Sequence, residues 1–268
     1  MVKYERIMKT KVNKIYQGNC LNIMKDFPNE SIDMVLTSPP YDNLRDYKGY
    51  KFDFENIAKE LFRIIKKGGV VVWIVCDSVV NGSETGTSFK QALFFKEIGF
   101  NLHDTMIYEK NGSSYPEKIR YYQVFEYMFV FSKGTPKTIN LLKDRKNKWE
   151  GSWGKRTTRN KNGELQQREK IGYQNYGIRY NIWRINTGYG FTTKDNFAYE
   201  HPAMFPEQLA QDHILSWTKE KDIILDPMCG SGTTLKMARL ANRNFIGIEI
   251  SKEYCEIIKN RLAQQKLL

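Results

Sequence analysis

The sequence predicts an α/β fold with one mostly parallel sheet that helices cover on both faces. Apolar runs of strand length alternate with amphipathic segments of helix length over most of the 268 residues, and this alternation is typical of parallel sheets. A basic, aromatic stretch interrupts the alternation once. We therefore expect one large domain with an insertion, divided into residues 1–133, 134–200 and 201–268.

Before the insertion, the apolar pattern predicts four strands and two helices. Ile57, Leu61, Ile64 and Ile65 recur at helical spacing, and Gly68-Gly69 follows as a helix stop. The β-branched run 70–75 is typical of a strand that is covered on both faces. The expected elements are a strand over 34–36, a helix over 54–67, a strand over 70–75, a helix over 89–98, and strands over 106–108 and 127–131 that form a late hairpin.

After the insertion, the alternation resumes at Pro206, which is a favourable first residue of a helix. Apolar side chains at helical spacing also mark a last helix around Tyr254 to Leu262. The elements expected between them are a strand over 223–225, a glycine-rich loop, a helix over 233–240 and a strand over 245–248.

Composition narrows the class of protein. A hydrophobic fraction of 41% excludes general disorder. The longest strongly apolar run, Val70 to Cys76, is far shorter than the roughly 20 residues of a membrane span, and no signal-peptide core can be drawn. The four cysteines are far apart and lack zinc-ligand spacing, so we expect no metal. We therefore expect a cytoplasmic protein.

The positive charge indicates a polyanionic partner. The net charge is +12, and residues 134–200 contain 14 Lys and Arg against 6 Asp and Glu. A protein this basic generally meets a polyanion such as nucleic acid. Because this excess lies with several Trp and Tyr residues, we expect the insertion to contact that partner.

Residues 226–234 predict a loop that binds a nucleoside cofactor. The stretch reads Asp-Pro-Met-Cys-Gly-Ser-Gly-Thr-Thr, follows the apolar run 223–225 and opens a helix. Glycines let the backbone approach a ligand, and the free N–H groups of the helix start favour a carboxylate. Thr233, where a P-loop has Lys, argues against ATP. Glu249, 23 residues after Asp226 at the end of a strand, suits ribose hydroxyls.

A second motif, Thr37-Ser38-Pro39-Pro40-Tyr41, follows the apolar run 34–36. It therefore lies at the carboxyl edge of the sheet, where α/β folds bind ligands. Two prolines fix the backbone and contribute no N–H, which leaves carbonyl oxygens as acceptors. Taken alone, the motif also fits a rigid turn or a polyproline recognition site.

Together the two motifs resemble those of the β-group DNA amino-methyltransferases. The resemblance covers roughly residues 15 to 262 and implies a Rossmann-like, circularly permuted fold that binds S-adenosylmethionine. Asp226 to Thr234 is similar to the family's Asp-Pro-Phe-x-Gly-Ser-Gly-Thr-Thr motif, with Met228 in place of the aromatic residue. His201 to Pro206 looks like the segment that helps hold the methionine moiety. Gln17 to Cys20 resembles the segment that contacts adenine, with Asn19 in place of an acid.

The resemblance implies a set of site residues. Ser38 Oγ and the Pro39 carbonyl would accept the hydrogens of the target amine, and Tyr41 would stack on the base. The implied catalytic residues are Ser38, Pro39, Pro40 and Tyr41. The implied cofactor-binding residues are Asn19, Cys20, His201, Pro202, Phe205, Asp226, Pro227, Met228, Gly230, Ser231, Gly232, Thr233 and Glu249.

The target atom stays open between two exocyclic amines. In this family a Ser at the position of Ser38 favours N4 of cytosine, whereas Asp favours N6 of adenine. Methylation at C5 of cytosine needs a nucleophilic Cys, typically after Pro, and no cysteine here follows a proline. His103, His201 and His213 are expected to be structural rather than catalytic.

The insertion is expected to recognise double-stranded DNA around a flipped-out base. The candidate DNA contacts are Lys155, Arg156, Arg159, Arg168 and Arg179. The resemblance implies a prokaryotic or phage-encoded enzyme that acts on the nucleoid. It would belong to a restriction-modification system with a cognate endonuclease or act alone, as a monomer or homodimer. Two alternatives are an RNA or protein-amide methyltransferase and a non-catalytic DNA-binding protein.

Overall fold

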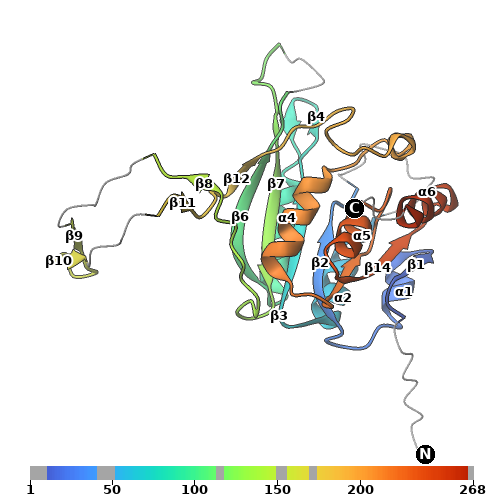
Figure 1. Ribbon diagram of the computed structural model, residues 1–268, viewed down its shortest axis with the longest axis horizontal. Coiled ribbons are helices and arrows are strands. Elements are labelled where there is room, and N and C mark those ends of the chain that lie inside the picture. Colours follow the sequence, from blue (N-terminus) through green and yellow to red (C-terminus); the bar gives the residue numbers. More distant parts are fainter. Residues whose placement is uncertain (1–10, 41–51, 113–117, 149–155, 169–173, 265–268) are drawn as a thin grey trace, which may run out of the picture. The chain divides into compact units, whose positions relative to one another are not determined.

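A computed structural model describes residues 11–40, 52–112, 118–148, 156–168 and 174–264 (Figure 1). The chain divides into two compact units. The large unit comprises Met1–Asn140 and Asn181–Leu268, and the small unit comprises Leu141–Tyr180. None of the helices in the described residues has the length and apolar character to cross a membrane.

The large unit is built on an eight-stranded sheet in the order β1-β14-β13-β2-β3-β7-β6-β12. Only β7 is antiparallel to its neighbours, β3 and β6, so the predictions of a mostly parallel sheet and a late hairpin are confirmed. The strands are β1 (Lys14–Gln17), β2 (Ile32–Thr37), β3 (Ile65–Val75), β6 (Asn101–Glu109), β7 (Phe125–Ser132), β12 (Ile182–Arg184), β13 (Ile223–Asp226) and β14 (Asn244–Glu249); β4 (Val79–Val80) and β5 (Ser83–Glu84) form a separate hairpin.

Helices cover both faces of this sheet. Successive strand residues point to opposite faces: Phe129 of β7 belongs to the core under α1, α2 and α3, whereas Met128 Sδ lies 3.2 Å from His213 Nε2 of α4. In Figure 1, α4 and α5 lie in front of the strands. The helices are α1 (Cys20–Met24), α2 (Phe54–Ile64), α3 (Thr87–Glu97), α4 (Glu207–Trp217), α5 (Thr233–Leu240) and α6 (Lys252–Ala263), with a 3₁₀ turn at Asn196–Glu200.

The strand order brings the two sequence motifs together. β13 lies between β14 and β2, with Leu225 opposite Val35 in a parallel pair. Parallel strands end at the same edge, so the glycine-rich loop after β13 and the Ser-Pro-Pro segment after β2 emerge side by side. The two segments are about 190 residues apart along the chain. The same sequence separation is bridged between these strands by the hydrogen bond from the Ile223 N–H to the Asp33 carboxylate.

The prediction of a helix over 54–67 is wrong at its C-terminal end, because α2 stops at Ile64. Ile65 already pairs with Ile32 of β2, so strand pairing prevails over helical spacing. Gly68 and Gly69 lie within β3 rather than at a helix end. A Cβ on Gly69 would lie 2.8 Å from the Asp33 carbonyl oxygen, so glycine permits close strand approach there.

The small unit spans fewer residues than the expected insertion of residues 134–200. Residues 181–200 belong to the large unit, where β12 extends the sheet beside β6. The three-residue β12 is too short to show a strand period. Within the small unit, β8 (Arg145–Lys146) pairs with β11 (Tyr176–Gly177), and β9 (Arg156–Arg159) pairs with β10 (Leu165–Arg168).

Candidate cofactor and catalytic site

A cavity of about 510 Å³ opens along the carboxyl edge of the sheet and is lined from both motifs. Gly232 does not line it but begins α5 with φ +81°, and a Cβ there would meet Ile258. Tyr41 lies outside the described residues. The expected residues in the wall are Asn19, Cys20, Ser38, Pro39, Pro40, His201, Pro202, Phe205, Asp226, Pro227, Met228, Gly230, Ser231, Thr233 and Glu249.

The Glu249 carboxylate holds the glycine-rich loop against the end of β14. Its Oε2 accepts the Gly230 N–H at 2.8 Å, and its Oε1 accepts the Ser251 N–H at 2.9 Å. Burial raises the pKa of this carboxyl, although the two N–H groups oppose the rise. A carboxylate oxygen has more than one acceptor site, so this side chain fits the two hydroxyls of a ribose.

Gly230 fits its place because it has no side chain. Its φ is +49°, and a Cβ would lie 2.6 Å from His201 Nε2. The His201 ring packs edge-on against Tyr254, with centroids 4.4 Å apart, and Nδ1 accepts the Ala203 N–H at 3.2 Å. His201 therefore joins the 201–205 segment to the loop on one side of the cavity.

Asp226 ends β13 as a carboxyl that is only 2% exposed. Burial raises its pKa to about 6, while hydrogen bonds, including one from the Met228 N–H at 3.2 Å, lower it. Asn19, which also lines the cavity, caps α1, with Oδ1 accepting the Leu21 N–H at 2.9 Å. Because that oxygen is engaged, Asn19 would meet a purine through its amide nitrogen, which is a donor.

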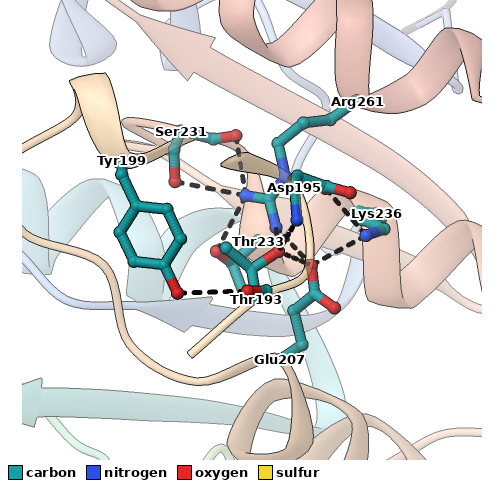
Figure 2. A network of polar contacts seen from close by, with 8 residues as sticks. All are labelled: Thr193, Asp195, Tyr199, Glu207, Ser231, Thr233, Lys236 and Arg261. Carbon is teal, nitrogen blue, oxygen red and sulfur yellow. Dashed lines mark hydrogen bonds and ion pairs between the residues drawn. The ribbon is translucent and has the colours of Figure 1, made fainter. Parts of the chain in front are cut away.

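A buried ion network behind the loop escaped the sequence analysis (Figure 2). Arg261 of α6 is 1% exposed, and its Nη1 donates to the Ser231 carbonyl at 3.0 Å and to Thr233 Oγ1 at 3.1 Å. Its Nε donates to Asp195 Oδ2 at 2.9 Å, and its Nη2 donates to Glu207. One guanidinium thus spans the loop, the 193–195 segment and the start of α4.

Lys236 completes this network from α5. Its Nζ lies 2.7 Å from Asp195 Oδ2 and 2.8 Å from Glu207 Oε1. Figure 2 shows both cations converging on the two carboxylates, while Tyr199 donates to the Thr193 carbonyl at 3.1 Å. Two cations against two anions leave the network neutral, which suits burial.

Three further side chains in the cavity wall were also missed. Tyr108 of β6, Lys110 just beyond it and Glu126 of β7 line the same cavity. Lys110 Nζ lies 3.2 Å from Glu126 Oε1. In the sequence they look like an ordinary polar strand end, and only the strand order brings them to this edge.

The other functional candidates have separate surroundings. Cys229 lines the cavity, but burial raises the pKa of its thiol well above the usual range, which disfavours a nucleophilic thiolate. His103 packs edge-on against Trp217, and His213 packs against Trp183 with centroids 4.5 Å apart. Both rings therefore contribute to packing.

The candidate DNA contacts lie in the small unit. Lys155 falls outside the described residues. The β9–β10 register places Arg156 opposite Arg168, and Arg159 is exposed with Nη1 donating to the Gly163 carbonyl at 2.8 Å. Arg179 is paired with Asp144, whose pKa it lowers, so DNA would have to compete for Arg179.

Comparisons with known proteins identify the family of the chain. Residues 32–260 match the N6_N4_Mtase family model, described as DNA methylase. The chain is 59% identical over 243 residues to the orphan methyltransferase M.BamHII of Bacillus amyloliquefaciens, covering 89% of this chain and 91% of the relative. It is 30% identical over 258 residues to the Type II methyltransferase M.BglII of Bacillus subtilis, covering 93% and 68% respectively.

Solved structures show the same fold. The PvuII DNA methyltransferase, named as cytosine-N4-specific, superposes with a TM-score of 0.71 at 22% identity, covering 95% of this chain and 88% of that one. M1.HpyAVI in complex with S-adenosylmethionine gives 0.60 at 25% identity, covering 93% and 98%. The chain therefore belongs to the N6/N4 DNA methylases, enzymes that transfer a methyl group from S-adenosylmethionine to DNA.

Proposed function

We propose that this methyltransferase acts on N4 of a cytosine that has been flipped out of duplex DNA. The observation that carries the proposal is the shared cavity, whose wall contains Ser38 and Pro39 as well as Gly230 and Glu249. S-adenosylmethionine supplies an electrophilic methyl group on a sulfonium. The chain supplies the acceptors that position the amine beside it.

Ser38 and Pro39 are proposed to make the amine nucleophilic. An exocyclic amine is a weak nucleophile because its lone pair is delocalised into the ring. Acceptors at its two hydrogens, Ser38 Oγ and the Pro39 carbonyl, favour a more tetrahedral nitrogen. The new N–C bond forms as the C–S bond breaks, the thioether leaves, and water takes the amine proton. Positioning and local electrostatics then account for the rate.

Cytosine is favoured over adenine by two observations. Ser38 stands where the family pattern places Ser in cytosine-N4 enzymes, and the PvuII structural neighbour is named as cytosine-N4-specific. Adenine N6 is the second candidate, because the matching family model spans both amine types.

Base flipping follows from the position of the cavity. Ser38 and Pro39 lie at the edge of a sheet whose faces are covered by helices, and a stacked base cannot reach such a site. Extrusion costs a few kcal/mol, which contacts to the DNA backbone must offset. We assign these contacts to the basic small unit.

A companion endonuclease is not required by this proposal. The relative that is 59% identical is named an orphan methyltransferase. We therefore place this chain with free-standing methyltransferases.

The product identifies the target. We expect DNA from cells that express the chain, in a host without other DNA methylation, to contain N4-methylcytosine when it is digested and analysed by mass spectrometry. Expression of the Ser38→Ala variant provides the matched control. N6-methyladenine would refute the cytosine assignment, and methylation of RNA alone would refute a DNA substrate.

The salt dependence of DNA affinity tests whether the small unit contacts the DNA backbone. Arg156→Gln with Arg168→Gln removes two positive charges from one cross-strand position. Each lost phosphate contact reduces the log–log slope of DNA affinity against salt by about 0.9, so the double variant should lose up to about 1.8. Lys219→Gln with Lys221→Gln, in the turn that precedes β13 in the large unit, is the equal-charge control. An unchanged slope in the arginine variant would contradict the assignment.

A further inference from the structure

The polar wall, defined as Tyr108, Lys110 and Glu126, belongs to the β6–β7 hairpin and the residue that follows β6, and all three residues line the cavity. Tyr108 and Lys110 are two residues apart, and Tyr108 pairs directly with Glu126 in the antiparallel register. Residues in these relations share a face of the sheet. Glu109, which lies between them, does not line the cavity and pairs with Arg184 at 2.8 Å.

The Tyr108 hydroxyl is buried and unsatisfied within the described part of the chain. The residue is 1% exposed, and its oxygen has no hydrogen-bond partner among the residues that the structure describes. Leaving a buried hydroxyl unsatisfied costs free energy, so a ligand atom that pairs with it would be stabilised. Burial, reinforced by the charge of Glu126, raises the phenol pKa, so the hydroxyl stays protonated and can donate.

The polar wall lies on the far side of the catalytic motif from the cofactor loop. Along the sheet edge the order runs from β14 and β13 through β2 to β3, β7 and β6. The segment Ser38 to Pro40 after β2 thus separates Gly230 and Glu249 from the polar wall within one cavity. A base that presents its amine to Ser38 would turn its adjacent ring edge toward β7 and β6.

We infer that Tyr108 and Lys110 bind the N3 and O2 atoms of the target cytosine, with Glu126 positioning the Lys110 ammonium. The inference rests on the proposed cytosine target. Beside its amine, cytosine carries two successive acceptors, N3 and O2, which match two donors. Adenine carries one acceptor, N1, followed by a C–H group, and would leave one donor without a partner. A site built to hydrogen-bond a ligand rejects an analogue that lacks the matching group.

The test is a cycle that combines protein variants with a base analogue. The substrate is a duplex carrying the site found by modified-base sequencing, with cytosine or 3-deazacytosine at the target position. The analogue keeps the amine and O2 but replaces N3 with C–H. Tyr108→Phe removes only the hydroxyl, and Lys110→Met removes the charge but keeps most of the chain length. Single-turnover rates at saturating cofactor are compared with those of the Glu109→Gln control.

On cytosine, the single-turnover rate of each wall variant should fall about tenfold to a hundredfold, as expected for a lost buried hydrogen bond. Replacing cytosine by 3-deazacytosine should slow the wild type by a similar factor. In the variant that lacks the donor to N3, the same replacement should slow the reaction by less than about threefold, because the effects of two groups that contact each other do not add. Glu126→Gln should weaken any coupling measured for Lys110, and cofactor affinity by calorimetry should stay unchanged in all variants.

The contrary outcomes are distinct. A purely structural Tyr108 predicts that Tyr108→Phe keeps full activity, because its hydroxyl bonds to no described residue. Full additivity of the analogue with both wall variants, or a large loss of cofactor affinity in Lys110→Met, would overturn the inference while leaving the cytosine target intact. N6-methyladenine as the wild-type product would instead overturn the proposed function itself.

Discussion

Asp226 shows how one residue of the cofactor site works against stability. Its carboxyl is buried at the junction of β13 and the loop, and this burial raises its pKa to about 6. The unfolded chain would titrate it near 3.8. Between these values the folded protein holds more protons than the unfolded chain, so the contribution of this group to stability is present below about pH 3.8 and is lost as the pH rises to 6.

Asp226→Asn removes this titration. Relative to wild type, the variant should gain free energy of unfolding as the pH rises, by up to roughly 3 kcal/mol at about 1.4 kcal/mol per pKa unit. Urea unfolding without cofactor at pH 4.5 and 7.5 should show about 2 kcal/mol of this gain, because part of the titration of the unfolded chain is complete below pH 4.5. Asp33 and Asp195, whose pKa values are lowered, change stability in the opposite direction but are common to both proteins. Parallel pH profiles for the two proteins would contradict the buried-charge account.

At the scale of elements, one side chain of α6 organises the cavity wall. Arg261 bonds to Ser231 and Thr233 of the loop while it pairs with Asp195 and Glu207. The loop and the segment leading into α4 therefore keep a common position. Arginine suits this task because the separate nitrogens of its planar guanidinium reach the loop and the carboxylates at the same time, whereas the ammonium of lysine is a single compact donor group.

Arg261→Lys keeps the charge but cannot reach both the loop and the carboxylates. We expect cofactor affinity, measured by calorimetry, to fall about tenfold, which is roughly 1.4 kcal/mol. The kcat at saturating cofactor should change by less than about threefold, because Arg261 positions the loop and does not touch the reacting atoms. Lys259→Met, on the same helix and paired only at the surface with Glu256, serves as the control. Unchanged cofactor affinity in Arg261→Lys would show that the network only supports the fold.

At the scale of the whole molecule, the sequence predicted the features that depend on the order of residues within one short segment, and it missed those that depend on contacts between distant segments. The loop at 226–234 and the strand before Ser38 are short apolar runs followed by glycine or proline, and their shared edge followed from the α/β alternation. Arg261 was missed because a basic residue in an amphipathic helix resembles a surface residue, and its partners come from distant elements. The polar wall was missed because only the β6–β7 register shows which side chains share the cavity.

The central claim is that the segment after β2 performs the transfer while the loop after β13 holds the cofactor. The most direct measurement compares cofactor affinity and single-turnover methylation for Ser38→Ala. Cofactor affinity by calorimetry should stay within about twofold, and the rate of transfer should fall by about a hundredfold or more, as for loss of an oriented polar group in other enzymes. Lost cofactor binding, or unchanged transfer, would contradict this division of roles.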